Sequence, residues 1–218
     1  MSTDAATIPR GEAVALRQPL PDTMRAAVFL GDGHVEVRDV PLSPPAPGQV
    51  LVRLQGCGVC ASNLPVWAGK PWFQYPFAAG APGHEGWGHV AALGAGVSGW
   101  RSGQRVALLS GNAYAEYDSA EASALVALPD SLRDQDLPGE PLACAINILR
   151  RSQIASGQWV AVVGVGFIGA MLVQLATAAG ARVVAVSRRA HALAVARRCG
   201  AVAALPSTDL HAAVAAVQ

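Results

Sequence analysis

Short apolar segments separated by glycine and proline occupy the chain between residues 24 and 130. Their lengths and spacing are typical of β-strands. The pattern predicts strands at residues 25–30, 35–40, 49–55, 88–93, 104–109 and 125–128. Because no helical pattern interrupts these strands, this part of the chain is expected to form a β-rich barrel or sandwich.

The spacing of the apolar residues changes to a helical period beyond Asp130. Helices are predicted at residues 140–151, 168–179 and 191–199, and strands at 159–163, 182–186 and 202–205. This alternation indicates a parallel, doubly wound sheet. The expected fold class is therefore a two-part α+β chain, with a β-rich domain at 24–130 and a partial α/β domain at 131–218. Residues 1–23 are polar and broken by proline, which indicates a loose tail.

The composition and charge of the chain exclude several classes of function. The 218 residues are 52% hydrophobic and 14% charged, which gives enough apolar material for a globular core. With a net charge of +1 and no block of like charges, the chain shows no footprint for a nucleic acid or an anionic membrane. No apolar run is long enough for a bilayer span or an export signal, so we expect a cytoplasmic protein with a small-molecule partner. Its four cysteines then indicate metal ligands or core thiols.

A glycine motif joins the predicted strand at 159–163 to the helix that follows it. At this junction, glycines allow a tight turn that aims backbone amides and the helix N-terminus at a pyrophosphate. The motif therefore predicts a dinucleotide site, and the alternative is that these glycines only ease strand–helix packing. The predicted contact residues are Gly164, Gly166, Phe167, Ile168 and Gly169.

The next predicted strand ends in Ser187, Arg188 and Arg189. An NAD-selective site normally carries an acidic residue here for the ribose 2′-hydroxyl. A hydroxyl followed by two guanidinium groups suits a 2′-phosphate instead, because charge-assisted hydrogen bonds can form to its oxygens. These residues therefore favour NADP(H) over NAD(H), and the alternative is that both arginines only form the solvated start of the next helix.

Four motifs in order carry a resemblance to a known family. They are Gly-Cys-Gly-Val-Cys-Ala-Ser-Asn at 56–63, Gly-His-Glu-Gly at 83–86, Glu-Pro-Leu-Ala-Cys at 140–144, and the glycine motif at 164–169. Together they resemble the zinc-dependent medium-chain dehydrogenase/reductase family, which includes alcohol and polyol dehydrogenases. The resemblance runs from Met24 to the C-terminus. It implies a GroES-like catalytic domain, a Rossmann-type cofactor domain and a zinc ion in the cleft between them.

The resemblance also implies a set of metal ligands. Cys60 and His84 match two of the family's ligands, Cys144 matches a thiolate of its alcohol dehydrogenase branch, and Glu140 matches a carboxylate near the metal in polyol-type members. Glu85 matches a carboxylate that ligates the metal or lies behind it. Because catalytic zinc needs three protein ligands and an open position, we expect Cys60, His84 and Cys144, with Glu85 as an alternating carboxylate and Glu140 as a weaker candidate. The alternative for Cys144 is a buried thiol inside a helix.

Three further positions are assigned by the same resemblance. Ser62 matches the hydroxyl that bonds the substrate alcohol. Pro65 stands where many members have a proton-relay histidine, and Asn63 replaces a carboxylate that commonly supports the ligating histidine. Aromatic residues follow at 65–77, where Trp67 is expected to contact the substrate, unless the stretch is only a hydrophobic loop covering the barrel.

The sequence reaches Gln218 in the helix that follows the third predicted strand of the α/β domain. The resemblance therefore covers only the adenosine half of a dinucleotide fold, and the strand at 159–163 should have an uncovered edge. We expect a truncated product, a fragment, or a subunit completed by another chain or by its own oligomer. Three functions stay open: a zinc- and NADP-dependent oxidoreductase of alcohols or polyols and the matching aldehydes or ketones, a zinc-independent quinone or enoyl reductase, and a noncatalytic cofactor-binding module.

Overall fold

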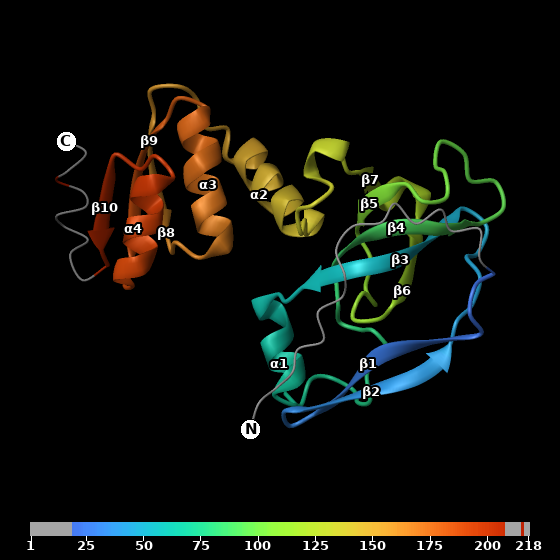
Figure 1. The fold of residues 1–218 in the computed structure, drawn as a ribbon. Helices are drawn as coiled ribbons and strands as arrows, with labels where there is room; N and C mark the ends of the chain where they lie inside the picture. Colours follow the sequence, from blue (N-terminus) through green and yellow to red (C-terminus); the bar gives the residue numbers. More distant parts are fainter. Residues whose placement is uncertain (1–18, 208–214, 216–218) are drawn as a thin grey trace. The chain divides into compact units, whose positions relative to one another are not determined.

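The computed structural model describes residues 19–207 and 215, and the chain divides after Glu140 into two compact units. The first unit is mainly β-structure and the second alternates helices and strands (Figure 1). The first unit contains β1 (Thr23–Gly31), β2 (His34–Pro41), β3 (Gln49–Gly58), α1 (Leu64–Trp67), β4 (Glu85–Leu93), β5 (Arg105–Leu108), β6 (Tyr117–Glu121) and β7 (Leu125–Ala127). Helix α2 (Gly139–Ser152) begins at the division, and β8 (Trp159–Val163), α3 (Phe167–Ala178), β9 (Arg182–Ser187), α4 (Ala190–Arg198) and β10 (Ala203–Pro206) follow.

An antiparallel sheet with the strand order β6-β3-β4-β5-β7 forms the centre of the first unit. Alternate residues of a strand point to one face, and most inward positions of this sheet are apolar. The buried cluster on this face consists of Val50, Val52, Val90, Val106, Leu108, Ala120 and Leu125. Strands β1 and β2 form a separate antiparallel ribbon, which meets the rest of the unit through the bridge between Ala26 and Ala115.

The predicted strands of the β-rich half are all present, although β3 ends at Gly58 rather than at Gln55. Strand β4 begins at Glu85 rather than Gly88, and β6 was not predicted at all. In β6 one of the two inward positions is the carboxylate of Asp118, which accepts hydrogen bonds from the backbone N–H groups of Asn112 and Ser119 at 3.0 and 2.8 Å. Because a buried acid occupies this inward position, the alternation of apolar and polar residues that indicates a strand is missing from β6.

The second unit is a three-stranded parallel sheet in the order β10-β9-β8 among the described residues. Helices α3 and α4 contribute to one buried cluster with the strands, which includes Val162, Val173, Val183, Ala185, Ala196 and Ala204. Because Val183 and Ala185 share one face of β9, both helices cover that face. The predicted parallel layout is confirmed, and β8 is an edge strand among the residues that the structure describes.

Most residues at the two ends of the chain lie outside the part that the structure describes. The predicted tail at 1–23 falls largely outside the described residues, but Thr23 belongs to β1 and is not part of a tail. Among the helices that the structure describes, none combines the length and the apolar character needed to cross a bilayer.

Candidate metal centre and nucleotide pocket

Two glycines in β3 make room for large side chains of β4. The antiparallel register pairs Gly58 with Glu85 and Gly56 with Trp87. A Cβ atom at Gly58 would lie 1.9 Å from Glu85 Oε2, and one at Gly56 would lie 2.4 Å from Trp87 Cζ2. No L side chain fits in either place. Glycine at these positions therefore lets the Glu85 carboxylate pack across the end of β3, where it is 8% exposed.

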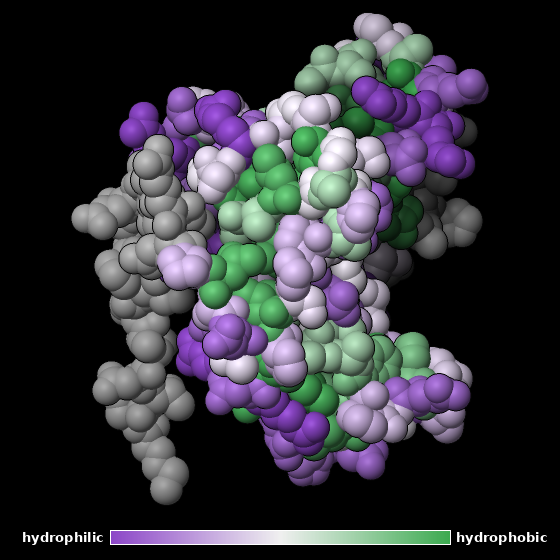
Figure 2. All heavy atoms as spheres, turned by 90° about the vertical axis from the view of Figure 1, so that its right-hand side faces the viewer, coloured by the Kyte–Doolittle hydropathy of each residue, from purple (hydrophilic) through white to green (hydrophobic). Residues whose placement is uncertain are grey.

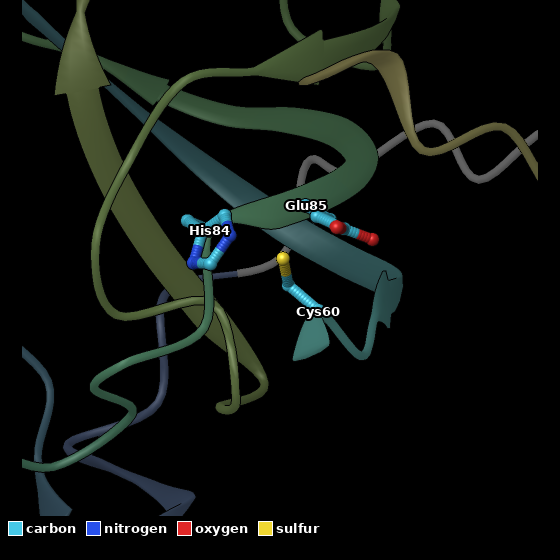
Figure 3. Close-up of side chains that lie close together, drawn as sticks. All are labelled: Cys60, His84 and Glu85. Carbon is cyan, nitrogen blue, oxygen red and sulfur yellow. The ribbon is translucent and has the colours of Figure 1, made fainter. Parts of the chain in front are cut away.

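The same strand pairing gathers three metal-binding groups. Cys60 follows the end of β3, while His84 and Glu85 lie at the start of β4, so the antiparallel register brings the two segments together. One ligand atom from each of the three residues lies within 4.8 Å of the others. Figure 3 shows the Cys60 sulfur between the imidazole ring of His84 and the carboxylate of Glu85. The structure thus unites three of the five predicted metal residues.

The His84 ring is oriented by a backbone carbonyl. Its Nδ1 lies 2.9 Å from the Pro82 oxygen, and a proton on Nδ1 donated to that oxygen leaves the Nε2 lone pair to bind a metal. Burial acts to lower the His84 pKa, but the Pro82 carbonyl, the Cys60 sulfur and the Glu140 carboxylate together raise it. The carbonyl therefore supports the histidine in this chain, in which Asn63 replaces the usual carboxylate.

The Cys60 thiol is electronically distinct from its neighbour Cys57. Hydrogen bonds from the Ser62 side chain and backbone lower the pKa of Cys60, and a hydrogen bond to His84 adds to this effect. Burial instead raises the pKa of Cys57 to about 11, and its thiol donates to the Gly58 carbonyl oxygen at 3.3 Å. Because metals bind the thiolate form, Cys60 is suited to ligation and Cys57 is not.

A hydrogen-bond chain leads from Ser62 away from the metal-binding groups. The Ser62 hydroxyl donates to Asn63 Oδ1 at 3.3 Å, Asn63 Nδ2 donates to the Tyr114 hydroxyl at 2.6 Å, and that hydroxyl donates to the Gly58 carbonyl at 3.3 Å. The Tyr114 ring stacks on Phe29, with ring centroids 5.8 Å apart. No motif in the sequence indicates Tyr114, because it lies in a loop far from Asn63 along the chain.

The other two predicted metal residues, Glu140 and Cys144, lie on α2. Glu140 stands in the first turn of α2 at the end of the first unit, and Cys144 is exposed on α2 within the second unit. Within the first unit, Glu140 is not one of the three residues whose ligand atoms lie within 4.8 Å of one another, although its carboxylate raises the pKa of His84. Trp67 ends α1 and lines a pocket of about 330 Å³ to which Cys60 also contributes.

The glycine motif forms a second pocket, of about 480 Å³, in the second unit. Gly164 has a φ of +94°, which glycine adopts without strain, and a Cβ atom at Gly169 would lie 2.1 Å from the Gly164 oxygen. A Cβ at Gly166 would meet nothing within 4 Å, so the backbone there is open to a ligand. Phe167 and Ile168 form the first turn of α3 and are not among the residues that line the pocket.

The polar end of this pocket consists of Ser187, Arg188 and Arg189 at the end of β9. The Ser187 hydroxyl oxygen accepts a hydrogen bond from the Arg189 N–H at 3.3 Å, and Arg189 Nη2 donates to the Val165 oxygen at 3.3 Å. Arg189 is also the N-cap residue of α4. Arg189 therefore links two parts of the pocket wall and caps the next helix. Arg188 also lines the pocket, and its side chain is exposed.

Comparisons with known proteins point to the alcohol dehydrogenases. Residues 46–130 match the family model of the alcohol dehydrogenase GroES-like domain. The chain is 32% identical over 220 residues to alcohol dehydrogenase notN from an Aspergillus species, which covers 84% of this chain and 62% of that relative. These matches support a medium-chain dehydrogenase/reductase, in which a GroES-like domain is followed by a Rossmann-type unit.

Solved structures share the fold. One, described as a zinc-binding dehydrogenase from Sinorhizobium meliloti bound to NADP, has a TM-score of 0.75 at 26% identity and covers 86% of this chain and 63% of that one. A cobalt- and zinc-bound thermostable alcohol dehydrogenase from Pyrobaculum aerophilum has a TM-score of 0.74 at 29% identity, with 88% and 68% covered. The chain thus spans less than two thirds of the curated relative and about two thirds of these structures.

Proposed function

We propose that this chain is the catalytic and adenosine-binding part of a zinc-dependent oxidoreductase. The enzyme transfers a hydride between NADP(H) and an alcohol or polyol, or the matching aldehyde or ketone. The observation that carries the proposal is the convergence of Cys60, His84 and Glu85, whose ligand atoms lie within 4.8 Å of one another in a GroES-like domain. The zinc-containing relative from Pyrobaculum aerophilum supports the choice of metal.

The metal-binding groups fit zinc by their chemistry. Thiolate, imidazole and carboxylate are all zinc ligands, and a catalytic site keeps one position open for substrate. We propose that Cys60 and His84 hold the ion and that Glu85 or Cys144 completes the set, with Glu140 nearby. When bound, zinc supplies a Lewis acid for an alcohol or carbonyl oxygen.

Ser62 is proposed to handle the substrate proton. The single hydroxyl hydrogen of Ser62 is within reach of both Asn63 Oδ1 and the Cys60 sulfur, and whichever of the two accepts it, the Ser62 oxygen keeps lone pairs to accept a hydrogen bond from a substrate hydroxyl. Asn63 is 6% exposed and held by Tyr114, so the Ser62 hydroxyl is pre-oriented. Because proline at position 65 carries no titratable group, we propose that the proton leaves Ser62 through water.

The second unit is proposed to bind the adenosine end of NADP(H). The first-turn amides of α3 lack intrahelical partners and attract the pyrophosphate, while Arg188 and the Ser187 hydroxyl recognise the 2′-phosphate. The NADP-bound Sinorhizobium meliloti structure supports this choice. Binding of NAD(H) remains an expected weaker alternative, since the glycine turn serves both cofactors.

Zinc analysis combined with NADPH and NADH titration tests the proposal. We expect about one zinc ion per chain, in keeping with a single catalytic site, and tighter binding of NADPH than of NADH. Replacing Ser62 with alanine should lower turnover about 100-fold or more while leaving zinc content unchanged, because positioned proton transfer contributes roughly 10²–10⁴-fold. Purified chain without zinc would contradict the proposal and favour the zinc-independent reductases.

A further inference from the structure

Three basic side chains form a row across the central sheet of the first unit, which we call the basic row. The strand registers pair Arg53 of β3 with His89 of β4, and His89 with Arg105 of β5. Side chains that are paired in this way lie about 4.5–5.5 Å apart at their Cβ atoms. The row lies on the face opposite the buried cluster, because each of its residues is the sequence neighbour of a buried valine: Val52, Val90 or Val106.

The positive charges of the basic row act on one another. Burial, followed by the charges of Arg105 and Arg53, lowers the pKa of His89. Among the described residues, no carboxylate offsets these charges at His89. Like charges that face each other across a sheet are destabilising. The row therefore holds two permanent positive charges around a histidine that an anion would help to protonate.

Arg105 is held in the row by neutral partners. Its Nε donates a hydrogen bond to Gln55 Oε1 at 2.9 Å, and its Nη1 and Nη2 donate to the carbonyl oxygens of Leu132 and Gln135. These bonds fix the guanidinium without neutralising its charge. Each of its two terminal nitrogens carries a second N–H that can bind a ligand.

Arg53 provides an exposed guanidinium at the other end of the row. The register places it beside Tyr117 of β6. Its charge contributes to the lowered pKa of Glu116, but that carboxylate already accepts hydrogen bonds from the backbone and the side chain of Arg25. The charge of Glu116 is therefore matched by Arg25.

We infer that the basic row binds a small dianionic oxyanion, namely phosphate or the phosphoryl group of a phosphate ester. Two guanidinium groups match its two negative charges, and N–H groups of Arg53, Arg105 and His89 can donate to its oxygens. The site is separate from the metal-binding groups, because Trp87, which is 7% exposed, occupies the same face of β4 between Glu85 and His89. It is also separate from the nucleotide pocket, which belongs to the second unit.

The strand register distinguishes the basic row from ordinary surface charges. Figure 2 shows one face of the molecule on which hydrophilic residues are visible among hydrophobic ones. Single charged residues of this kind are normal on protein surfaces and define no site. Arg101 is such a residue, because it is exposed in the loop before β5. Arg53 differs because its strand holds it in register with two further basic residues.

The imidazole NMR signals of His89 test the inference on the unaltered chain, and a His89→Gln variant assigns these signals. Inorganic phosphate, sulfate and phenyl phosphate are titrated, with chloride at matched ionic strength as the control. We expect saturable shifts of the His89 signals with the three oxyanions and none with chloride. Tighter binding of phenyl phosphate than of inorganic phosphate would identify phosphate esters as the ligands, and the reverse would identify free phosphate. Unchanged His89 signals with all three oxyanions would overturn the inference.

The pH dependence of sulfate binding gives a second measurement, because sulfate keeps its charge while histidine titrates. A bound dianion favours the protonated imidazole and so raises the pKa of His89. By linkage, sulfate binds more tightly as the pH falls through that pKa, and we expect its Kd to fall by about tenfold or more. A Kd that stays constant while His89 titrates would contradict the inference.

A pair of arginine variants locates the site. Arg53→Gln should raise the Kd for sulfate by about tenfold or more, because it removes charge-assisted hydrogen bonds. It should also raise the pKa of His89 in the free protein, because one neighbouring positive charge is lost. Arg101→Gln removes the same charge outside the row and should leave both quantities unchanged. Equal weakening by the two variants would show that sulfate responds only to the general charge of the surface, and would overturn the inference.

Arg53 is the residue to replace because its exposed side chain supports no other element. Arg105 is less suitable, since its hydrogen bonds to Leu132 and Gln135 hold the segment before α2. Neither arginine variant touches the metal-binding groups or the glycine turn. Zinc content and NADPH affinity should therefore equal those of the unaltered chain, and thermal unfolding shows whether each variant is folded.

Discussion

The metal-binding groups and the nucleotide pocket are built in different ways. Cys60, His84 and Glu85 converge as side chains because β3 and β4 pair antiparallel. The nucleotide pocket is formed by backbone at successive strand–helix turns, with Gly164 and Gly166 at its centre. The first region therefore depends on the chemical identity of a few side chains, whereas the second depends on the absence of side chains.

Glycine serves both regions for different reasons. Gly58 leaves space for the Glu85 carboxylate, which reaches within 1.9 Å of where a Cβ would stand. Gly169 leaves space for the Gly164 carbonyl, 2.1 Å from its own missing Cβ. The first glycine positions a proposed metal ligand and the second shapes a turn. Substitutions in each region should consequently leave the function of the other intact.

The largest effect is expected from removing the thiolate. Cys60→Ala should reduce zinc affinity by more than the roughly 10–100-fold that loss of a supporting hydrogen bond costs, because a direct ligand disappears. NADPH binding should persist. Cys57→Ala is the matched control, since that thiol is held protonated by a pKa of about 11 and should not affect zinc content. Metal analysis with NADPH titration measures both; full zinc content in Cys60→Ala would remove Cys60 from the site.

A pair of glycine variants should separate packing from ligand approach. Gly169→Ala is expected to lower stability by roughly 1–3 kcal/mol, because its Cβ displaces the Gly164 carbonyl, and to weaken NADPH binding as the turn shifts. Gly166→Ala meets nothing within 4 Å, so it should weaken NADPH binding alone. Thermal unfolding and NADPH titration measure these effects. Equal unfolding temperatures for the two variants would contradict the assigned roles, and zinc content should be normal in both.

A smaller effect is expected at the 2′-phosphate. Arg188→Ala should raise the Kd for NADPH by about tenfold or more, because hydrogen bonds between charged groups contribute roughly 1.5–3 kcal/mol. Binding of NADH, which lacks the phosphate, should change little. The ratio of the two dissociation constants is the measurement. A parallel loss of both affinities would show that Arg188 acts on the turn and does not recognise the phosphate.

The helices and strands of the second unit could be predicted closely from the sequence, because its strands are mainly continuous apolar runs. Strand β8 has the predicted bounds Trp159–Val163, and the helix after it begins at Phe167, one position from the predicted start. The strands of the first unit were harder to predict. Strand β6 was missed since Asp118 occupies an inward position, and β4 began earlier than expected because a buried Glu85 opens it.

The donor residues could be named from local motifs, but their arrangement could not. The space for Glu85 depends on the register between β3 and β4, which no single motif contains. The contact of Asn63 with Tyr114 joins residues from different loops and likewise follows only from the folded sheet. Pairwise contacts of this kind are set by tertiary packing rather than by the order of residues along the chain.

The smallest effect is expected at an ion pair that ties β1 to the loop before β6. The backbone N–H and guanidinium of Arg25 hold the pKa of Glu116 below its usual range, with a side-chain contact of 2.9 Å. Because the folded pKa lies below the unfolded one, the stabilisation is complete above the unfolded value of about 4.3 and is lost as the pH falls through the folded value. Both side chains are largely exposed, at 69% and 44%, so solvent screening limits the contribution to about 0–1 kcal/mol.

Glu116→Gln should therefore lower the urea midpoint slightly at pH 7 and leave it nearly unchanged at pH 3, where the native carboxyl is also losing its charge. Glu36→Gln is the control, because that carboxylate pairs with Arg38 on the same strand and joins no separate elements. Neither variant touches the metal-binding groups or the glycine turn, so zinc content and NADPH affinity should match the unaltered chain. A variant that lost either function would show that β1 supports the sites through more than this ion pair.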